Sequence, residues 1–181
     1  MVWQIPTTKS TTSREQTMNY RDQFVALTLL SAALILPSTC ILGADMAVDP
    51  AVGTWTLNLA KSKLDPNEPA LKSSVRTYTA TPDGLKVLIH SVDADGTAHD
   101  TGSTFTYDGK PHSVSGPSDY DTIAVTRVGT NDSKSDLIKS GKVIGHLTRM
   151  VSKDGKTMTV TADGTNAKGA KFHEVTVYAR Q

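Results

Sequence analysis

The sequence of 181 residues is poor in several things at once: it has one cysteine, few aromatic residues (6%) and no excess of either charge. A single cysteine excludes an intrachain disulfide. The 19 basic and 18 acidic residues give a net charge of +1 and are interspersed along the chain, so no basic stripe is present to hold nucleic acid. A chain of this length has room for one domain with its own hydrophobic core.

Motifs for catalysis are also missing. The sequence has no Gly-x-Ser-x-Gly, no glycine-rich phosphate loop and no pair of acidic residues that stands out as an acid and a base. Residues 93–96 (DADG) begin like a calcium loop but lack its later ligands, so we interpret them as a hairpin turn. We expect no enzyme, no metal and no cofactor. The histidines lack the two- or four-residue spacing that would place two on one face: His90, His99, His112, His146 and His173.

Leu and Glu are sparse in the C-terminal three quarters of the chain, whereas Thr, Ser, Gly and Asp are abundant. This bias disfavours helices and favours strands joined by tight turns. Hairpin-type Asp-Gly pairs occur at 83–84, 95–96, 108–109, 154–155 and 163–164, with weaker signals at 140–141 and 168–169. Between them lie β-rich stretches at 53–59, 75–80, 85–92, 101–107, 122–128, 142–152, 157–161 and 171–180. Strands at this spacing predict an all-β fold, a sandwich or a barrel. The tight turns indicate an antiparallel meander, and we favour an up-and-down barrel of about eight to ten strands because closure removes the exposed sheet edges.

Alternation of apolar and polar residues is readable in several of these stretches. Trp55, Leu57 and Leu59 share one face of the first, as expected for a barrel wall. In the last stretch, one face carries Phe172, Glu174, Thr176 and Tyr178 and the other His173, Val175, Val177 and Ala179, which leaves open which side faces inward. Residues 64–73 (LDPNEPALKS) contain two prolines and are the expected irregular connection.

The N-terminal part has the layout of an export signal. Residues 24–36 (FVALTLLSAALIL) are apolar, follow Arg14 and Arg21, and precede the small residues Gly43 and Ala44. The run is short for a membrane span, which needs about 20 apolar residues. We therefore predict cleavage near Gly43 or Ala44, with an uncleaved N-terminal anchor as the alternative.

This signal segment divides the chain into residues 1–44, the signal peptide and N-terminal extension, and residues 48–181, a barrel domain without a membrane span. The domain is expected in the periplasm or secreted. The true start of the translated chain is Met1 or Met18, because the stretch before Met18 is polar and Thr-rich and a start at Met18 gives a signal of ordinary length. Cys40 lies where a lipoprotein acceptor would lie, but the residues before it fit a lipobox poorly, so we expect it to leave with the signal. Oligomeric state is not indicated.

The stretch 53–63 (GTWTLNLAKSK) resembles the opening of a group of uncharacterised exported bacterial proteins that are lipocalin-like (calycin) barrels. The likeness extends through 107–110 (YDGK) and 152–157 (SKDGKT) to the end of the chain. The opening motif is moderately specific and the turns are weak alone. The resemblance implies the barrel fold, with Gly53 and Trp55 in structural roles and the indole plugging one end, but it implies no activity.

A more distant likeness is to fatty-acid-binding proteins, through the same opening and the aromatic last strand. Those proteins hold a carboxylate with Arg-x-Tyr on that strand, whereas this chain has Thr176 and Tyr178, so the arginine is missing. Their helical lid would also fall in the proline-broken segment. Both departures argue against transferring fatty-acid binding.

Arginines on the expected strands are the best candidates for a binding site. Arg127 and Arg149 each follow apolar residues at every second position, so each is expected to project from an apolar wall into a cavity. A buried arginine needs a partner, and an anionic ligand is one; the alternative is an arginine that reaches solvent at a strand end. Arg76 and Tyr78 form a similar pair. The candidate ligand-binding residues are Arg127, Arg149, Tyr78, Tyr178 and Tyr107.

Residues 116–121 (GPSDYD) form a further polar cluster, two carboxylates and a tyrosine, in a loop expected at the mouth or base of the barrel. A polar turn is the simpler interpretation. Taken together, the sequence favours an exported barrel that carries or senses a small apolar, amphipathic or anionic ligand. The alternative is a filled barrel that acts as an interaction module of the cell envelope, for instance an inhibitor or assembly factor. An enzyme ranks third among the three interpretations.

Overall fold

A computed structural model describes the protein from residue 48 to the C-terminus, with the exception of residue 67. The signal segment, its cleavage site and Cys40 lie outside the described residues. In chain order the strands are β1 (Gly53–Leu57), β2 (Leu71–Ala80), β3 (Gly84–Asp93), β4 (Ala98–Thr106), β5 (Asp108–Ser115), β6 (Thr122–Arg127), β7 (Asp132–Lys139), β8 (Lys142–Val151), β9 (Thr157–Thr165) and β10 (Lys171–Arg180).

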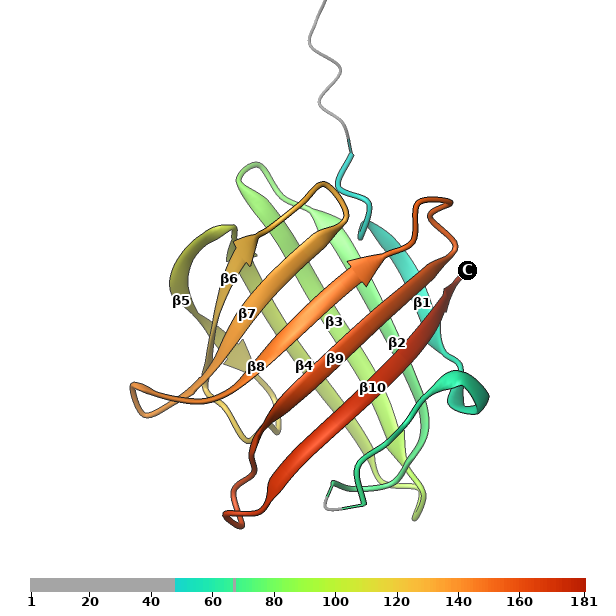
Figure 1. Cartoon of the computed structure of the whole chain (residues 1–181), viewed down its shortest axis with the longest axis vertical. Coiled ribbons are helices and arrows are strands. Elements are labelled where there is room, and N and C mark those ends of the chain that lie inside the picture. Colours follow the sequence, from blue (N-terminus) through green and yellow to red (C-terminus); the bar gives the residue numbers. More distant parts are fainter. Residues whose placement is uncertain (1–47, 67) are drawn as a thin grey trace, which may run out of the picture. The chain divides into compact units, whose positions relative to one another are not determined.

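These ten strands form a closed barrel in which each strand pairs with its sequence neighbours and β10 pairs with β1 (Figure 1). Every pairing is antiparallel, and the closing pair sets Trp55 opposite Arg180. The predicted all-β up-and-down barrel is confirmed. Closure gives each strand two neighbours and leaves no open sheet edge at the seam. No helix between residues 48 and 181, residue 67 aside, is long and apolar enough to cross a membrane.

Strands β5 and β7 were not among the predicted stretches, because neither has apolar alternation. On β7 the buried positions include Ser133 and Ser135. On β5, Pro111 has no N–H to donate, and the His112 ring takes up the amide N–H of Thr106 at 3.4 Å. β4 and β5 accordingly pair at only two positions.

Two local predictions are wrong. Asp163-Gly164 is not a turn but lies inside β9, where Gly164 faces Gly145 of β8. A Cβ on Gly164 would lie 2.6 Å from the carbonyl oxygen of Ile144, so glycine is needed for the close approach of the two strands and not for a hairpin. The first strand ends at Leu57, and Leu59 lies exposed in a short 3₁₀ turn, η1 (Leu59–Lys61), which Asn58 caps.

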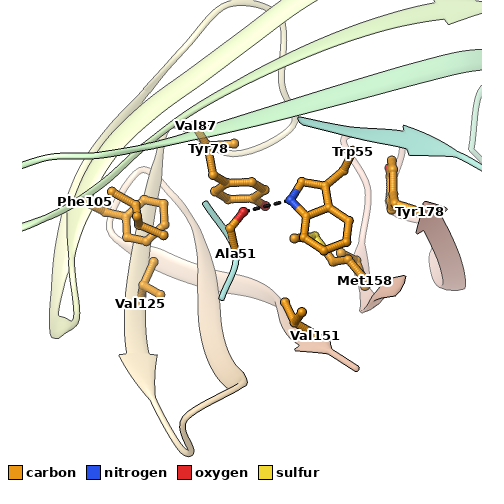
Figure 2. Packing of buried hydrophobic residues seen from close by; sticks show 11 residues of the cluster. Ala51, Trp55, Tyr78, Val87, Phe105, Val125, Val151, Met158 and Tyr178 are labelled. Carbon is orange, nitrogen blue, oxygen red and sulfur yellow. Dashed lines mark hydrogen bonds between the residues drawn. The ribbon is translucent and has the colours of Figure 1, made fainter. Parts of the chain in front are cut away.

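One end of the barrel, here called the plug end, is closed by residues 48–52 and a buried apolar cluster (Figure 2). Trp55 is fully buried there, and its indole N–H donates to the carbonyl of Ala51 at 2.8 Å. Gly53 has a φ of +132°, and a Cβ at this position would lie 2.6 Å from the Arg180 guanidinium. Both residues therefore hold structural positions at this end.

The opposite end, here called the mouth, is surrounded by the connection from η1 to β2 and by the turns β3–β4, β7–β8 and β9–β10. The connection is irregular at residues 62–66 and 68–70, apart from one bridge between Lys63 and Val175, close to the predicted stretch. Residues 116–121, here called the mouth loop, join β5 to β6 at this end. The interior between mouth and plug end contains the residues described next.

Candidate functional site

Two arginines enter the barrel interior from separate walls. Arg76 lies on β2 between the buried residues Ser74 and Tyr78, and Arg149 lies on β8 two residues before the buried Val151. Since alternate residues of a strand share a face, both side chains point inward. Arg149 is only 5% exposed. Burying such a charge costs several kcal/mol unless it is compensated.

The compensation within the protein comes mainly from aromatic rings. The guanidinium carbon of Arg76 lies 4.8 Å from the ring centre of Tyr178, and that of Arg149 lies 5.0 Å from the ring centre of Tyr78. In the part of the chain that the structure describes, no carboxylate lies within 4.0 Å of either guanidinium. The Nε atoms of both arginines are buried and have no hydrogen-bond partner. The interior therefore holds two positive charges that are only partly compensated.

The phenol of Tyr78 lies between these two charges. Burial would raise the pKa of Tyr78, but the positive charges of Arg149 and Arg76 outweigh burial, so the pKa is lowered. The field at this point of the interior is thus positive enough to favour a negative charge. An anionic group brought here would gain from the same field.

Arg127 and Tyr107 lie at the plug end, in a network that Arg149 connects to the interior. The Tyr107 hydroxyl donates to Asp49 Oδ2 at 2.6 Å and accepts from Arg149 Nη2 at 2.7 Å. Arg127 forms an ion pair with Asp49 and lies over the Tyr107 ring, with its guanidinium carbon 4.0 Å from the ring centre. Burial, together with the hydrogen bond to Asp49, raises the pKa of Tyr107 to about 12. This network joins residues 48–52 to the barrel wall.

Two cavities occupy the interior, and they meet at Arg76 and Tyr120. The inner cavity has a volume of about 50 Å³ and is lined by Arg76, Tyr78 and Arg149 together with apolar side chains such as Phe105 and Val125. The mouth cavity has a volume of about 180 Å³. Arg76, Tyr120 and Leu147 line both. The Tyr120 side chain and the Arg76 head group thus divide one interior into two chambers.

Tyr120 reaches this position because the mouth loop is fixed at several points. Gly116 packs so closely on β4 that a Cβ would lie 1.9 Å from the Asp100 carbonyl oxygen. Asp119 Oδ2 accepts from the Ala167 amide of the β9–β10 turn at 3.2 Å. Asp121 Oδ2 accepts from the Ser140 amide of the β7–β8 turn at 2.9 Å. The loop crosses the mouth as a strap attached to three parts of the barrel.

Of the candidate residues from the sequence, Tyr78 and Arg149 line the inner cavity, and Tyr178 is buried beneath Arg76. Arg127 and Tyr107 line neither cavity and hold the plug end. The structure adds Glu174, which lines the mouth cavity on the face of β10 shared with Thr176 and Tyr178. The alternation in the last predicted strand already placed Glu174 on one face with Thr176 and Tyr178. The sequence alone did not show that this face points inward.

Histidines on the barrel wall pair with aspartates of the neighbouring strand or of the same hairpin. Examples are His90 with Asp100 at 2.7 Å and His146 with Asp136 at 2.8 Å, both largely exposed. Within residues 48–66 and 68–181, no group of three or more His, Cys, Asp or Glu side chains is placed to hold a metal ion.

Comparison of the chain with protein-family models finds no match, and comparison with curated proteins finds none either.

Proposed function

We propose that this protein binds one small amphipathic ligand inside the barrel, through an anionic group of the ligand, and acts as a carrier or sensor outside the cytoplasm. The observation that carries the proposal is the position of Arg76. Its charge points into the interior, lines both cavities and has no carboxylate within ion-pair distance in the described chain. An anionic group would supply the missing partner.

The lining of the interior supports an amphipathic ligand. The inner cavity combines the arginine and tyrosine side chains with an apolar wall from β3 to β6, to which Val87, Phe105 and Val125 belong. Drug-sized ligands occupy pockets of about 300 Å³ or more. Both cavities here are smaller, about 50 and 180 Å³, which favours a ligand of few heavy atoms.

The cellular part of the proposal rests on the sequence. The apolar run at 24–36, with arginines before it and small residues after it, favours export of the barrel domain.

Native mass spectrometry of the full chain, before and after incubation with a small-molecule extract of cells, tests the binding. We expect an added mass that solvent extraction removes. The adduct should be lost in Arg76→Met and Arg149→Met, because methionine keeps the stem of the side chain and removes its charge. Arg127→Met is the matched control and should keep the adduct, since Arg127 lines neither cavity.

Circular dichroism spectra of the variants establish that each one folds. A bare mass for the wild type under all conditions would contradict the proposal and favour the filled-barrel interaction module. An adduct that persists in Arg76→Met would place the ligand elsewhere.

A further inference from the structure

The mouth cavity carries opposite charges at its two ends. Arg76 lies at its inner end, where the two cavities meet. Glu68 and Asp119 belong to the connections that surround the mouth, and Glu174 lies near the start of β10. A shallower hollow of about 400 Å³ shares these three carboxylates and lies towards solvent. The way into the barrel therefore passes an acidic rim before it reaches the arginine.

Glu174 is the carboxylate that faces the interior without a partner. Glu68 Oε1 accepts from the Asn166 amide at 3.0 Å, and Asp119 accepts from the Ala167 N–H. The Glu174 carboxylate forms no hydrogen bond or ion pair with any residue that the structure describes. Burial raises its pKa, and the nearby charges of Glu68 and Asp65 act in the same direction, although Arg76 opposes them. Each of the two ends thus holds a charge without a direct partner of opposite sign.

Ligands with a single charge fit this cavity poorly. A simple anion gains at Arg76 but is repelled by the three carboxylates at the rim, and a simple cation is repelled by Arg76 and Arg149. A molecule with an anionic group at one end and a cationic group at the other gains at both ends. The ring of Phe172 in the cavity wall, two positions before Glu174 on β10, would also favour a cation near the rim.

We propose that the ligand is a zwitterion, held with its anionic group at Arg76 and its cationic group among Glu68, Asp119 and Glu174. This inference rests on the proposed function and narrows its ligand class. The apolar wall between the charged ends, which includes Leu137 and Val160, fits a short hydrocarbon spacer between the two groups. The cavity selects by orientation, because only one direction of such a ligand matches the field.

Calorimetric titration of the full chain with matched probes tests the inference. One set is γ-aminobutyrate, butyrate and butylamine, and a second is ε-aminocaproate, caproate and hexylamine, so spacer length varies while the end groups are matched. In at least one set we expect the amino acid to bind at least about tenfold more tightly than its alkanoate and its amine. Glu174→Gln should reduce the preference over the alkanoate to less than threefold, as a rough limit.

Asp136→Asn is the matched control, because Asp136 is a half-exposed carboxylate that lines neither cavity. It should keep the full preference. If Glu174→Gln does not fold, Glu68→Gln provides the same comparison. An alkanoate that binds the wild type as tightly as its amino acid would overturn the zwitterion and leave the proposed function intact. Absence of binding by all six probes would also overturn the zwitterion proposal. The proposed function is tested separately, by the native mass spectra.

Discussion

The arginines that lie over aromatic rings differ in their other contacts, and the difference separates structure from binding. Arg180 donates to three backbone carbonyls, and Arg127 has the Asp49 carboxylate. Arg149 donates to the Tyr107 hydroxyl. Arg76 has the tyrosines Tyr178 and Tyr78 beside its guanidinium but no carboxylate within ion-pair distance among the described residues. The need for an external partner is therefore greatest at Arg76, in the middle of the interior.

Asp49 allows a prediction at this scale. Burial would raise its pKa, but the hydrogen bonds from Tyr107 and the Ala51 N–H and the ion pair with Arg127 outweigh burial, so the pKa is lowered. A lowered pKa in the folded state stabilises the fold above the unfolded-state pKa of about 4, and this contribution is lost as the pH falls through the folded-state pKa. Asp49→Asn should therefore reduce the free energy of unfolding at neutral pH by about 1–3 kcal/mol.

Urea unfolding at neutral pH and in strong acid measures the effect. The difference between wild type and Asp49→Asn should shrink as Asp49 becomes protonated. Asp83→Asn removes an exposed carboxylate and should change stability little at either pH. A loss for Asp49→Asn that is the same at both pH values would show that the charge of Asp49 does not contribute.

At the scale of elements, the turns and the apolar alternation predicted an antiparallel all-β fold, and the resemblance of the opening stretch favoured the barrel. Strand β7 was missed because its inward positions include the small polar residues Ser133 and Ser135, and β5 because it contains Pro111, an exposed residue of a type that is rare in strands. A serine on an inward face gives the same local pattern as a serine in a loop. Only the neighbouring strands reveal that it is buried.

The candidate site, like the fold, could be predicted only in part from the sequence. Apolar alternation indicated that Arg127 and Arg149 point inward, but it could not separate their roles. The partner of Arg127 is Asp49, which lies 78 positions earlier in the chain, and no local pattern indicates this pairing. The charged residues of the mouth also come from segments far apart in the sequence, so they were seen as separate polar turns.

A close approach between two strands, at Gly145 and Gly164, gives the prediction at this scale. A Cβ on Gly164 would meet the backbone of Ile144 at 2.6 Å and of Gly145 at 2.8 Å, and backbone atoms cannot move aside cheaply. Gly164→Ala should therefore lower the free energy of unfolding by about 1–3 kcal/mol. Thermal and urea unfolding of the variant and the wild type measure this difference in the free energy of unfolding. Gly129→Ala is the control, because its nearest neighbour is the Asp132 side chain at 3.1 Å, and it should cost clearly less. Equal losses would refute the explanation by close approach.

At the scale of the whole barrel, Arg180 connects segments that are distant in sequence. Its guanidinium donates to the carbonyls of Pro50, Val52 and Gly155, each at 2.6 Å, and lies over Trp55 with 4.3 Å to the ring centre. Arg180 thereby connects β10 to residues 50–52 at the plug end and to the β8–β9 turn.

Arg180→Met should therefore weaken closure of the barrel and lower the free energy of unfolding by about 1–3 kcal/mol. The loss is limited because the guanidinium is exposed and its hydrogen bonds compete with water. Lys86→Met, an exposed charge removal on β3, should be nearly neutral. Unfolding followed by circular dichroism and by near-ultraviolet aromatic signals should remain one coincident transition. Two separated transitions in Arg180→Met would mean that the plug end unfolds independently of the barrel.

The pairing of β1 with β10 also sets a time order for folding. β1 finds its second neighbour only in β10, so the barrel cannot close until β10 has been synthesised. Until then two strand edges have no partner. For a chain that crosses a membrane before it folds, this delay has a use. Under the export proposed above, a barrel that closes late would leave the polypeptide unfolded long enough to pass through a translocation channel.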